Sequence, residues 1–465
     1  SSSTVVLVNF ETRKVLILDI MRMFSFFVFA AVLAPCCEAD RPISIKGQQF
    51  WDTKANRSVL FAGPNIVMKG HPWLPDVNGT TSCMNITVFP NDTCKTFSEH
   101  DIDFMKAKGY TAIRLGVTWA GAQPTNMPQI DAEFLEKLYA ILDLCEKNGI
   151  HVILDPHQDA YGTSTCGQGA PMWFSKLGVA SDIGKPLVPL RLPYAPKGSI
   201  KNYTDGACSH TDDTTWGLFA GDPDYNIKNP CCLLNNGGNS NIILSEEAQK
   251  GFTYLFNGGR SYYVRYIKLL AEAVKDKPSA VAIELFNEPT AFGPQDALYG
   301  IWHTWKECYD AIQDVAPGML VGVMSIGEQP IDPILNRLTM PLGYTDWLLH
   351  ARYAFYAWHW YHGPPHKQGS ISNAKSYQND WNMPSLLTEH ADEEVGQMAL
   401  AAGIGQLYWS YSGYCNTAPD QRCHNLTQEQ AACRNDGAVA HCQHVPGCDF
   451  GACITGYGRK LNPPL

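Results

Sequence analysis

The sequence contains no long basic run, no internal repeat and, after residue 39, no apolar run as long as a membrane-spanning helix needs. Lys and Arg number 35 against 45 Asp and Glu, so the formal net charge is −10. Nucleic acid is recognised through basic patches, so a nucleic-acid partner is not expected. No cysteine pair has zinc-site spacing with matching histidines, and no zinc site is predicted. With 45% hydrophobic residues, the composition is instead that of a globular protein with a sizeable core.

Residues 21–39 have the layout of a secretory signal peptide. A short basic start precedes an apolar run over residues 24–34, and small residues lead to a cleavage site after Ala39. A membrane anchor is the alternative, but the run is shorter than the ~20 residues of a spanning helix. Residues 1–20 have no obvious role and are excluded from the fold. The sequence therefore predicts a protein of the secretory route, either extracellular or in a lysosomal or digestive compartment.

Cysteines and glycosylation sequons agree with this route. The chain has 16 Cys, most of them after Ala39, which is typical of an oxidising compartment and favours disulfides over metal binding. The pairing does not follow from the sequence. Six Asn-X-Ser/Thr sequons are present, at Asn56, Asn78, Asn85, Asn91, Asn202 and Asn425. We predict a glycosylated, disulfide-containing protein.

Eight short apolar runs alternate with helical stretches, which indicates an α/β protein with parallel strands. Helices are expected at 99–108, 131–148 and 249–275; the second shows a helical apolar period and is followed by Gly149, a typical helix stop. A doubly wound sheet is the alternative to a TIM (β/α)₈ barrel. The barrel is favoured because chemically capable polar residues follow many different strands. The expected strands are 60–67, 112–115, 151–154, 280–286, 320–325, 354–360, 385–388 and 405–409.

Two segments interrupt this alternation. Residues 156–245 follow the third strand, are rich in Gly, Pro, Asn, Asp and Cys, and show little periodicity, which predicts a long lid insertion. Residues 413–465 contain six Cys and predict a short Cys-rich appendage. The expected organisation is therefore 1–39 for upstream residues and signal peptide, 40–412 for the barrel, and 413–465 for the tail.

Two glutamates at strand ends supply the carboxyl pair that glycoside hydrolysis needs. Glu288 lies in the motif Leu-Phe-Asn-Glu-Pro, and Glu389 ends a second apolar run about three βα units later. Such hydrolysis uses one carboxyl to protonate the leaving oxygen and another to attack the sugar or activate water. We predict Glu288 as general acid/base and Glu389 as nucleophile, with Asn287 bound to the sugar 2-OH. Taken singly, each motif also fits an ordinary turn or a solvated glutamate.

Other strand ends carry supporting side chains. Arg114 lies within an apolar run and needs a partner, because an unpaired buried charge is very costly. It can hold Glu389 ionised, form a structural salt bridge, or do both. His359 and Tyr361 can orient the nucleophile. Trp409 can stack on a sugar ring, although an aromatic residue here is more often part of the core.

The third strand ends in Asp155-Pro156-His157-Gln158-Asp159, which places three titratable groups within five positions. Metal binding is one interpretation of this cluster. No further ligand at metal spacing follows, so binding of sugar hydroxyls by His157 and Asp159 is favoured.

As an ordered set, these residues resemble family 5 glycoside hydrolases of clan A, over roughly residues 43–412. Local motifs are similar to those of endoglycoceramidases and related glycosylceramidases. The motifs are Gly63-Pro64-Asn65 followed by Lys69, the stretches 153–159 and 166–173, and Tyr408-Trp409-Ser410-Tyr411.

The resemblance implies a TIM barrel that needs no metal or other cofactor, with Glu288 as acid/base and Glu389 as nucleophile. Two features depart from the pattern. His390 and Ala391 follow the nucleophile where relatives often carry Phe-Gly, and a Cys-rich tail stands where many relatives have a β-sandwich. By the same resemblance, the sugar contacts are Lys69, His157, Asp159, Asn287, Tyr361 and Trp409.

The function hypothesis is a retaining β-glycosidase that cleaves the glycan–ceramide linkage of glycosphingolipids. Its partners would be a glycolipid or oligosaccharide substrate and, transiently, a membrane or micelle surface. Apolar lid residues such as Trp216 either line a slot for ceramide or form the insertion's own small core. The alternatives are a secreted β-glucanase, β-mannanase or glucosylceramidase of the same clan. A non-catalytic glycan-binding protein is a remote alternative, because both glutamates are retained.

Overall fold

The computed structural model describes residues 41–68, 73–78, 97–159, 161–165, 168–181, 243, 245–290, 295–327, 330, 333–361 and 366–409. Most of the predicted lid, including Trp216, and all of the Cys-rich tail lie outside these residues, as does Lys69. None of the helices within the described ranges combines the length and apolarity needed to cross a bilayer.

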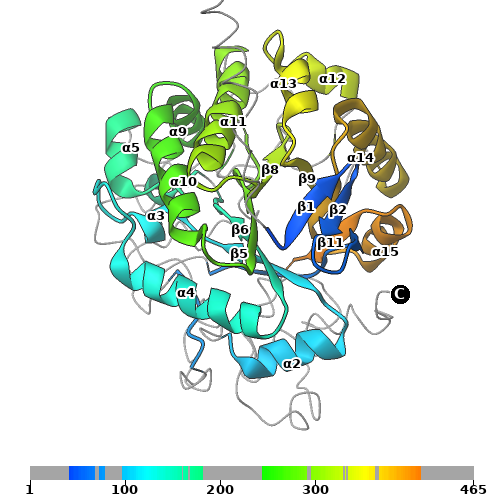
Figure 1. The fold of residues 1–465 in the computed structure, drawn as a ribbon. Helices are drawn as coiled ribbons and strands as arrows, with labels where there is room; N and C mark the ends of the chain where they lie inside the picture. Colours follow the sequence, from blue (N-terminus) through cyan, green and yellow to red (C-terminus); the bar gives the residue numbers. More distant parts are fainter. Residues whose placement is uncertain are drawn as a thin grey trace, which may run out of the picture. The chain divides into compact units, whose positions relative to one another are not determined.

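Eight parallel strands pair in chain order from β4 to β11 and close into a barrel when β11 pairs with β4 (Figure 1). The predicted TIM barrel is therefore confirmed, and the doubly wound alternative is wrong. Each expected strand is present, with ends shifted by no more than a few residues. The strands are β4 (Ala62–Ile66), β5 (Ala112–Gly116), β6 (His151–Asp155), β7 (Ala280–Glu284), β8 (Leu320–Met324), β9 (Ala354–Trp360), β10 (Ser385–His390) and β11 (Gly405–Tyr408).

Helices surround the barrel, and their apolar faces pack against the strands in one large core. Short helices also occur between strands: α3 (Trp119–Ala122), α5 (Met172–Gly178), α12 (Pro333–Arg337), α13 (Tyr344–His350) and the 3₁₀ turn η2 (Thr163–Thr165). The longer helices are α2 (Glu99–Ala107), α4 (Ala132–Lys147), α9 (Glu246–Phe256), α10 (Arg260–Val274), α11 (Gln295–Val315), α14 (Lys367–Trp381) and α15 (Glu393–Ala401).

Local sequence explains where several helices begin. The side chain of Asp131 accepts a hydrogen bond from the Phe134 amide at the start of α4, and Ser245 caps α9 in the same way. The helix expected over 249–275 is wrong as a single element. It is broken at residues 257–259, where Gly259 packs so closely that a Cβ atom would lie 2.5 Å from the Phe174 ring.

A small antiparallel sheet that the sequence did not suggest precedes the barrel. It consists of β1 (Ile43–Lys46), β2 (Gln49–Asp52) and β3 (Arg57–Val59). Ile43 and Phe50 from this sheet join a core with apolar side chains from the barrel strands, mostly from their N-terminal halves. The sheet thus closes the N-terminal end of the barrel with apolar side chains, and the opposite end is left for polar ones.

Cys145 and Cys308 are buried free thiols, and burial raises the pKa of both. The prediction of disulfides is therefore wrong for these two residues, which pack as small apolar side chains in α4 and α11. The other cysteines lie outside the described part of the chain.

Candidate active site

A layer of buried polar side chains fills the C-terminal end of the barrel. Six different strands contribute one residue each, and all six residues are at most 3% exposed. Barrel enzymes build their active sites at this end, from the ends of several strands. The residues are Asn65 in β4, Arg114 in β5, Asp155 in β6, Glu284 in β7, His359 in β9 and Glu389 in β10.

Arg114 lies at the centre of this layer and contacts three carboxylates. Its Nε atom lies 2.5 Å from Glu284 Oε2, its Nη2 atom lies 2.9 Å from Asp155 Oδ1, and its Nη1 atom contacts Glu389 Oε1. Burial alone would lower the pKa of Arg114, but the carboxylates outweigh it and raise the pKa. The predicted partners of this charge are thus present. Arg114 also donates to the amide oxygens of Asn65 and Asn287, at 2.8 and 2.9 Å.

Glu284 was not singled out from the sequence, although it is an ionisable residue in an apolar run just as Arg114 is. It is fully buried, and burial raises the pKa of its carboxyl to about 7, against the effect of Arg114. The hydroxyl of Thr388, the residue before the nucleophile candidate, lies 3.2 Å from Glu284 Oε1. Glu284 therefore links the Arg114 cluster to β10.

Glu389 has both carboxylate oxygens held. Arg114 contacts Oε1, and the Tyr361 hydroxyl donates to Oε2 at 2.6 Å. The pairing of β10 with β9 shifts register between Leu387 and Glu389, so Thr388 is an extra residue on β10. Such bulges re-aim side chains beside active sites. The bulge turns Glu389 into the polar layer, where it is 3% exposed.

Glu288 follows the end of β7 with a backbone φ of 45°, in the left-handed region that non-glycine residues rarely adopt. Its Oε1 atom lies 2.8 Å from His359 Nδ1, and the same nitrogen lies 3.6 Å from Glu389 Oε2. Burial lowers the pKa of His359 to about 3, so the ring is neutral near pH 7. His359 therefore stands between the two glutamates without adding a charge to either.

The two glutamates lie close together. One carboxylate oxygen of Glu288, one of Glu389 and a ring nitrogen of His359 all lie within 4.8 Å of one another. In retaining glycosidases the two carboxyl groups are about 5–5.5 Å apart, whereas inverting enzymes need about 6.5–9.5 Å to admit a water molecule. The observed separation therefore fits the retaining geometry.

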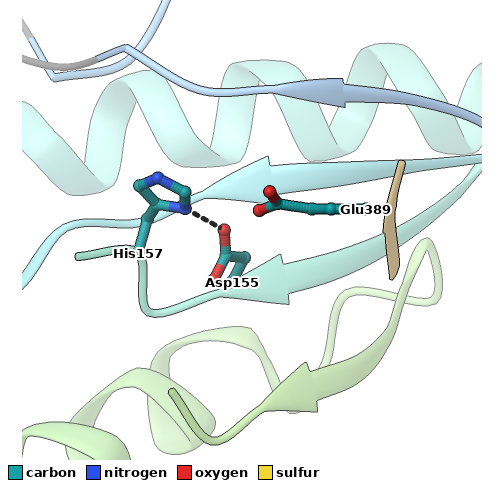
Figure 2. A group of neighbouring side chains, drawn as sticks. All are labelled: Asp155, His157 and Glu389. Atoms are coloured by element: carbon teal, nitrogen blue, oxygen red, sulfur yellow. Dashed lines mark hydrogen bonds and ion pairs between the residues drawn. The ribbon is translucent and has the colours of Figure 1, made fainter. Parts of the chain in front are cut away.

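His157 is held between two carboxylates at the end of β6. Its Nδ1 atom lies 2.6 Å from Asp155 Oδ2 (Figure 2). Its Nε2 atom lies 3.3 Å from Asp159 Oδ2. Burial lowers the pKa of His157, but Asp155 and Asp159 outweigh it and raise the pKa to about 9. The Trp409 ring stacks on the imidazole with centroids 5.5 Å apart. In this structure Trp409 thus covers His157, and any sugar platform uses its other face.

Among the residues that the structure describes, two groups have the donor geometry for a metal ion: Asp155, His157 and Glu389, and Glu288, His359 and Glu389. In the first group, Arg114 already contacts both carboxylates and supplies the positive charge. The second group contains the proposed catalytic pair.

The structure brings together all the predicted site residues that it describes. Lys69 and Trp216 lie outside the described residues. Asn65 and Gln158 were not predicted as site residues. Asn65 donates to three backbone oxygens of β10 and of β11, the strand that pairs with β4.

The departure at His390 has a structural explanation. Its Nε2 atom lies 2.6 Å from Gln406 Oε1 on β11, and its Nδ1 atom lies 2.8 Å from the Asp392 carbonyl. Gly396 leaves room for the ring, because a Cβ atom there would lie 2.7 Å from it. His390 is therefore a packed residue behind the site, and it leaves Glu389 in place.

Comparisons with known proteins agree with this geometry. Residues 76–185 match the family model Cellulase (glycosyl hydrolase family 5). The chain is 27% identical over 236 residues to an endoglycoceramidase of Hydra vulgaris, covering 50% of this chain and 38% of the relative. It is 28% identical over 254 residues to an endoglycoceramidase of Cyanea nozakii, covering 52% and 41%. The chain thus spans about two fifths of the length of these relatives.

A solved structure, that of an endogalactoceramidase, superposes with a TM-score of 0.53 and covers 80% of this chain and 74% of the other. At 17% identity this likeness shows the fold alone. The resemblance to the family rests on the sequence matches. The resemblance to glycoside hydrolase family 5 and to its endoglycoceramidases is therefore confirmed by the family model and by the curated relatives.

Proposed function

We propose that this chain is a retaining β-glycoside hydrolase with Glu288 as general acid/base and Glu389 as nucleophile. The observation that carries the proposal is the close approach of the two carboxyls at the C-terminal end of the barrel, within 4.8 Å through their nearest ligand atoms. Glu389 is held by Arg114 and Tyr361, as an ionised nucleophile requires. Glu288 is instead held against neutral His359.

The proposed reaction has two steps. In the first, Glu389 attacks the anomeric carbon as the glycosidic C–O bond breaks, and Glu288 gives its proton to the leaving oxygen. In the second, Glu288 takes a proton from water, and the water oxygen displaces Glu389 from the sugar. The two inversions return the original anomeric configuration and restore both carboxyls.

We propose glycosphingolipids as the substrate, cut between glycan and ceramide. The support is the agreement of the predicted motifs with the relatives from Hydra vulgaris and Cyanea nozakii, which are each named endoglycoceramidase. Hydrolysis of a soluble β-glucan or β-mannan, and release of a single glucose from glucosylceramide, are the competing outcomes. A substrate of this class reaches the site from a membrane or micelle surface, which makes transient contact with that surface part of the proposal.

The test is hydrolysis of lactosylceramide and of a ganglioside in detergent, with product analysis. We expect intact oligosaccharide plus ceramide, and an initial product of unchanged anomeric configuration by NMR. Glu389→Gln should abolish the reaction, whereas Glu133→Gln on the exposed surface of α4 should leave it unchanged. Activity on soluble β-glucan alone would reject the lipid substrate but keep the two glutamates. An inverted product would reject the mechanism.

We also propose that the protein follows the secretory route. The support is the signal-like segment at residues 21–39, the sequons and the cysteine content. Expression in a eukaryotic host should deliver the protein to the medium, with a mass that falls on enzymatic removal of N-glycans. Retention in the cytosol without glycans would contradict this.

A further inference from the structure

Gln158 lies three residues beyond the end of β6 and is 1% exposed, yet none of the proposed chemical steps uses it. Its side-chain Nε2 atom donates to the Asn287 carbonyl at 2.7 Å and to the Glu288 carbonyl at 3.2 Å. In return, Asn287 Nδ2 donates to the Gln158 carbonyl at 2.8 Å. The loop after β6 and the loop after β7 are thus joined by hydrogen bonds in both directions.

The backbone that Gln158 holds is strained. Glu288 has a φ of 45°, a left-handed conformation that is unfavourable for an L-residue with a side chain. Glu288 also precedes Pro289, and the residue before a proline is normally pushed into extended conformations. Strain of this kind persists only where the surroundings enforce it, and it is concentrated at functional sites. Some contact outside the local sequence must therefore stabilise the turn.

Gln158 has the geometry to supply that contact. Its Nε2 bonds end on two successive carbonyls, one on either side of the strained Cα atom. Its Oε1 atom is fixed in turn by the Tyr161 amide at 2.9 Å. Gly169 packs against Gln158 so closely that a Cβ atom at residue 169 would lie 2.5 Å from Gln158 Cβ, which leaves no room for a larger residue there. Thr290 adds a hydroxyl bond to the Glu288 carbonyl at 3.0 Å but does not reach Asn287.

We propose that Gln158 is a positioning residue that holds the Glu288 carboxyl where it can protonate the leaving oxygen. The inference rests on the proposed function, because it assigns Glu288 the acid/base role. The proposal predicts that, without the Gln158 amide donor, proton transfer to the leaving oxygen becomes slower while nucleophilic attack by Glu389 continues. A general acid contributes about 10²- to 10⁴-fold to a rate, so partial misplacement leaves a measurable loss.

The test compares two aryl β-lactosides, one with a poor phenol leaving group and one with 2,4-dinitrophenol, which departs without protonation. Gln158→Met keeps the side-chain volume and removes the donor. We expect kcat/KM to fall at least about tenfold for the phenyl substrate and less than about threefold for the dinitrophenyl substrate. Azide, a nucleophile that needs no general base, should restore kcat on the activated substrate and yield a β-lactosyl azide.

Gln313→Met is the matched control. The Gln313 amide also bridges backbone groups, donating to the Met319 carbonyl and accepting from the Gly318 amide, but at the other end of the barrel. Gln313→Met should lower the melting temperature without changing the ratio of kcat/KM for the phenyl substrate to kcat/KM for the dinitrophenyl substrate. If Gln158→Met fails to fold, Gln158→Glu keeps the acceptor for Tyr161 and loses the donor when ionised, so the same ratio is expected to change.

Equal losses on both aryl substrates, or no response to azide, would overturn the proposal and leave Gln158 with a purely structural role. Failure of the proposed function is distinguishable. In that case the unmodified protein would hydrolyse neither lactoside, or Glu288→Ala would not produce the same dependence on the leaving group.

Discussion

At Glu389 each carboxylate oxygen is held by a different side chain, Arg114 on one and Tyr361 on the other. A hydrogen bond to a charged group contributes about 1.5–3 kcal/mol, so Tyr361→Phe should lower kcat/KM by about 10- to 100-fold. The melting temperature should change little, because the ring itself remains. Tyr139→Phe, which removes a hydroxyl that bonds the Ala273 carbonyl far from the site, serves as the control. An unchanged kcat/KM in Tyr361→Phe would mean that this contact does not prepare the nucleophile.

Substitution of Arg114 should have a larger effect, because its guanidinium is paired with three buried carboxylates. Lysine keeps the charge but lacks the planar fork that reaches several partners at once. We expect Arg114→Lys to lower the free energy of unfolding by about 3–5 kcal/mol and to abolish measurable hydrolysis. Arg337→Lys, at an exposed pair with Asp380, should cost no more than about 1 kcal/mol. Denaturant unfolding compares the two, and equal costs would contradict the central role of Arg114.

Residue by residue, the sequence predicted what can be recognised from local pattern. Arg114 and the two glutamates were accessible because each is an ionisable group next to an apolar strand. Glu284 carried the same signal and was missed, since it lies inside the run that ends in the stronger Asn287-Glu288 motif. Gln158 stands within the motif at residues 153–159, but nothing in that motif predicts its role. Its hydrogen bonds reach two carbonyls 129 and 130 residues away, and no residue type at position 288 suggests the backbone angle found there.

Among the elements, the sheet β1–β3 makes the two ends of the barrel different, because it covers the N-terminal end with apolar side chains. Phe50 in β2 is 2% exposed and packs against Phe61 and Phe355, with ring centroids 4.9 and 5.4 Å away. Phe50→Ala should therefore lower the free energy of unfolding by about 3–5 kcal/mol. Activity measured well below the melting temperature should be retained, because the polar layer lies at the other end of the strands.

Trp51 is the matched control on the same strand, since it is only partly buried and contacts Lys46. Trp51→Ala should cost about 1 kcal/mol or less. Urea unfolding of both variants decides the matter. If Phe50→Ala also lowered the free energy of unfolding by only about 1 kcal/mol, the sheet would not contribute to closing the barrel.

The eight barrel strands were predictable because parallel strands buried on both faces read as near-continuous apolar runs. The sheet β1–β3 was not, because its strands have only 3–4 residues each and mix exposed with buried positions. The break between α9 and α10 was missed for a different reason. Their apolar periods continue one another across Gly258 and Gly259, and the break is enforced by packing against Phe174 and Tyr254.

For the molecule as a whole, the barrel combines an apolar N-terminal end with a charged C-terminal end, and the charged end makes stability depend on pH. His359, Glu284 and His157 have pKa values of about 3, about 7 and about 9, against ordinary values of 6.5, 4.5 and 6.5. Stability rises with pH wherever the unfolded chain binds more protons than the native protein, and falls where it binds fewer.

His359 affects stability in the acid range. Between pH 3 and 6.5 this side chain is protonated in the unfolded chain but neutral in the native protein, so the free energy of unfolding decreases as the pH falls. Glu284 has the opposite effect between pH 4.5 and 7. In this range its carboxyl is protonated in the native protein but ionised in the unfolded chain, so the free energy of unfolding decreases as the pH rises. The two effects largely cancel between pH 4.5 and 6.5. These groups therefore predict a plateau of stability in that range and a decline on either side.

The alkaline decline belongs mainly to His157. Below pH 6.5 both states are protonated, and between 6.5 and 9 the native protein keeps a proton that the unfolded chain has released. Its stabilising contribution is thus fully present below pH 6.5 and lost by pH 9, with a slope of about 1.4 kcal/mol per pH unit. His157→Gln should reduce the slope of unfolding free energy against pH in this window by about one proton.

His151, at the other end of β6, is the control, because burial lowers its pKa and it does not titrate above pH 6.5. His151→Gln should leave the slope between pH 6.5 and 9 unchanged even if it shifts the whole curve. Urea unfolding at half-unit steps of pH measures both slopes. If His157→Gln and the unmodified protein lost stability in parallel, the proton would belong to another group, and the imidazole between Asp155 and Asp159 would be neutral in the native protein.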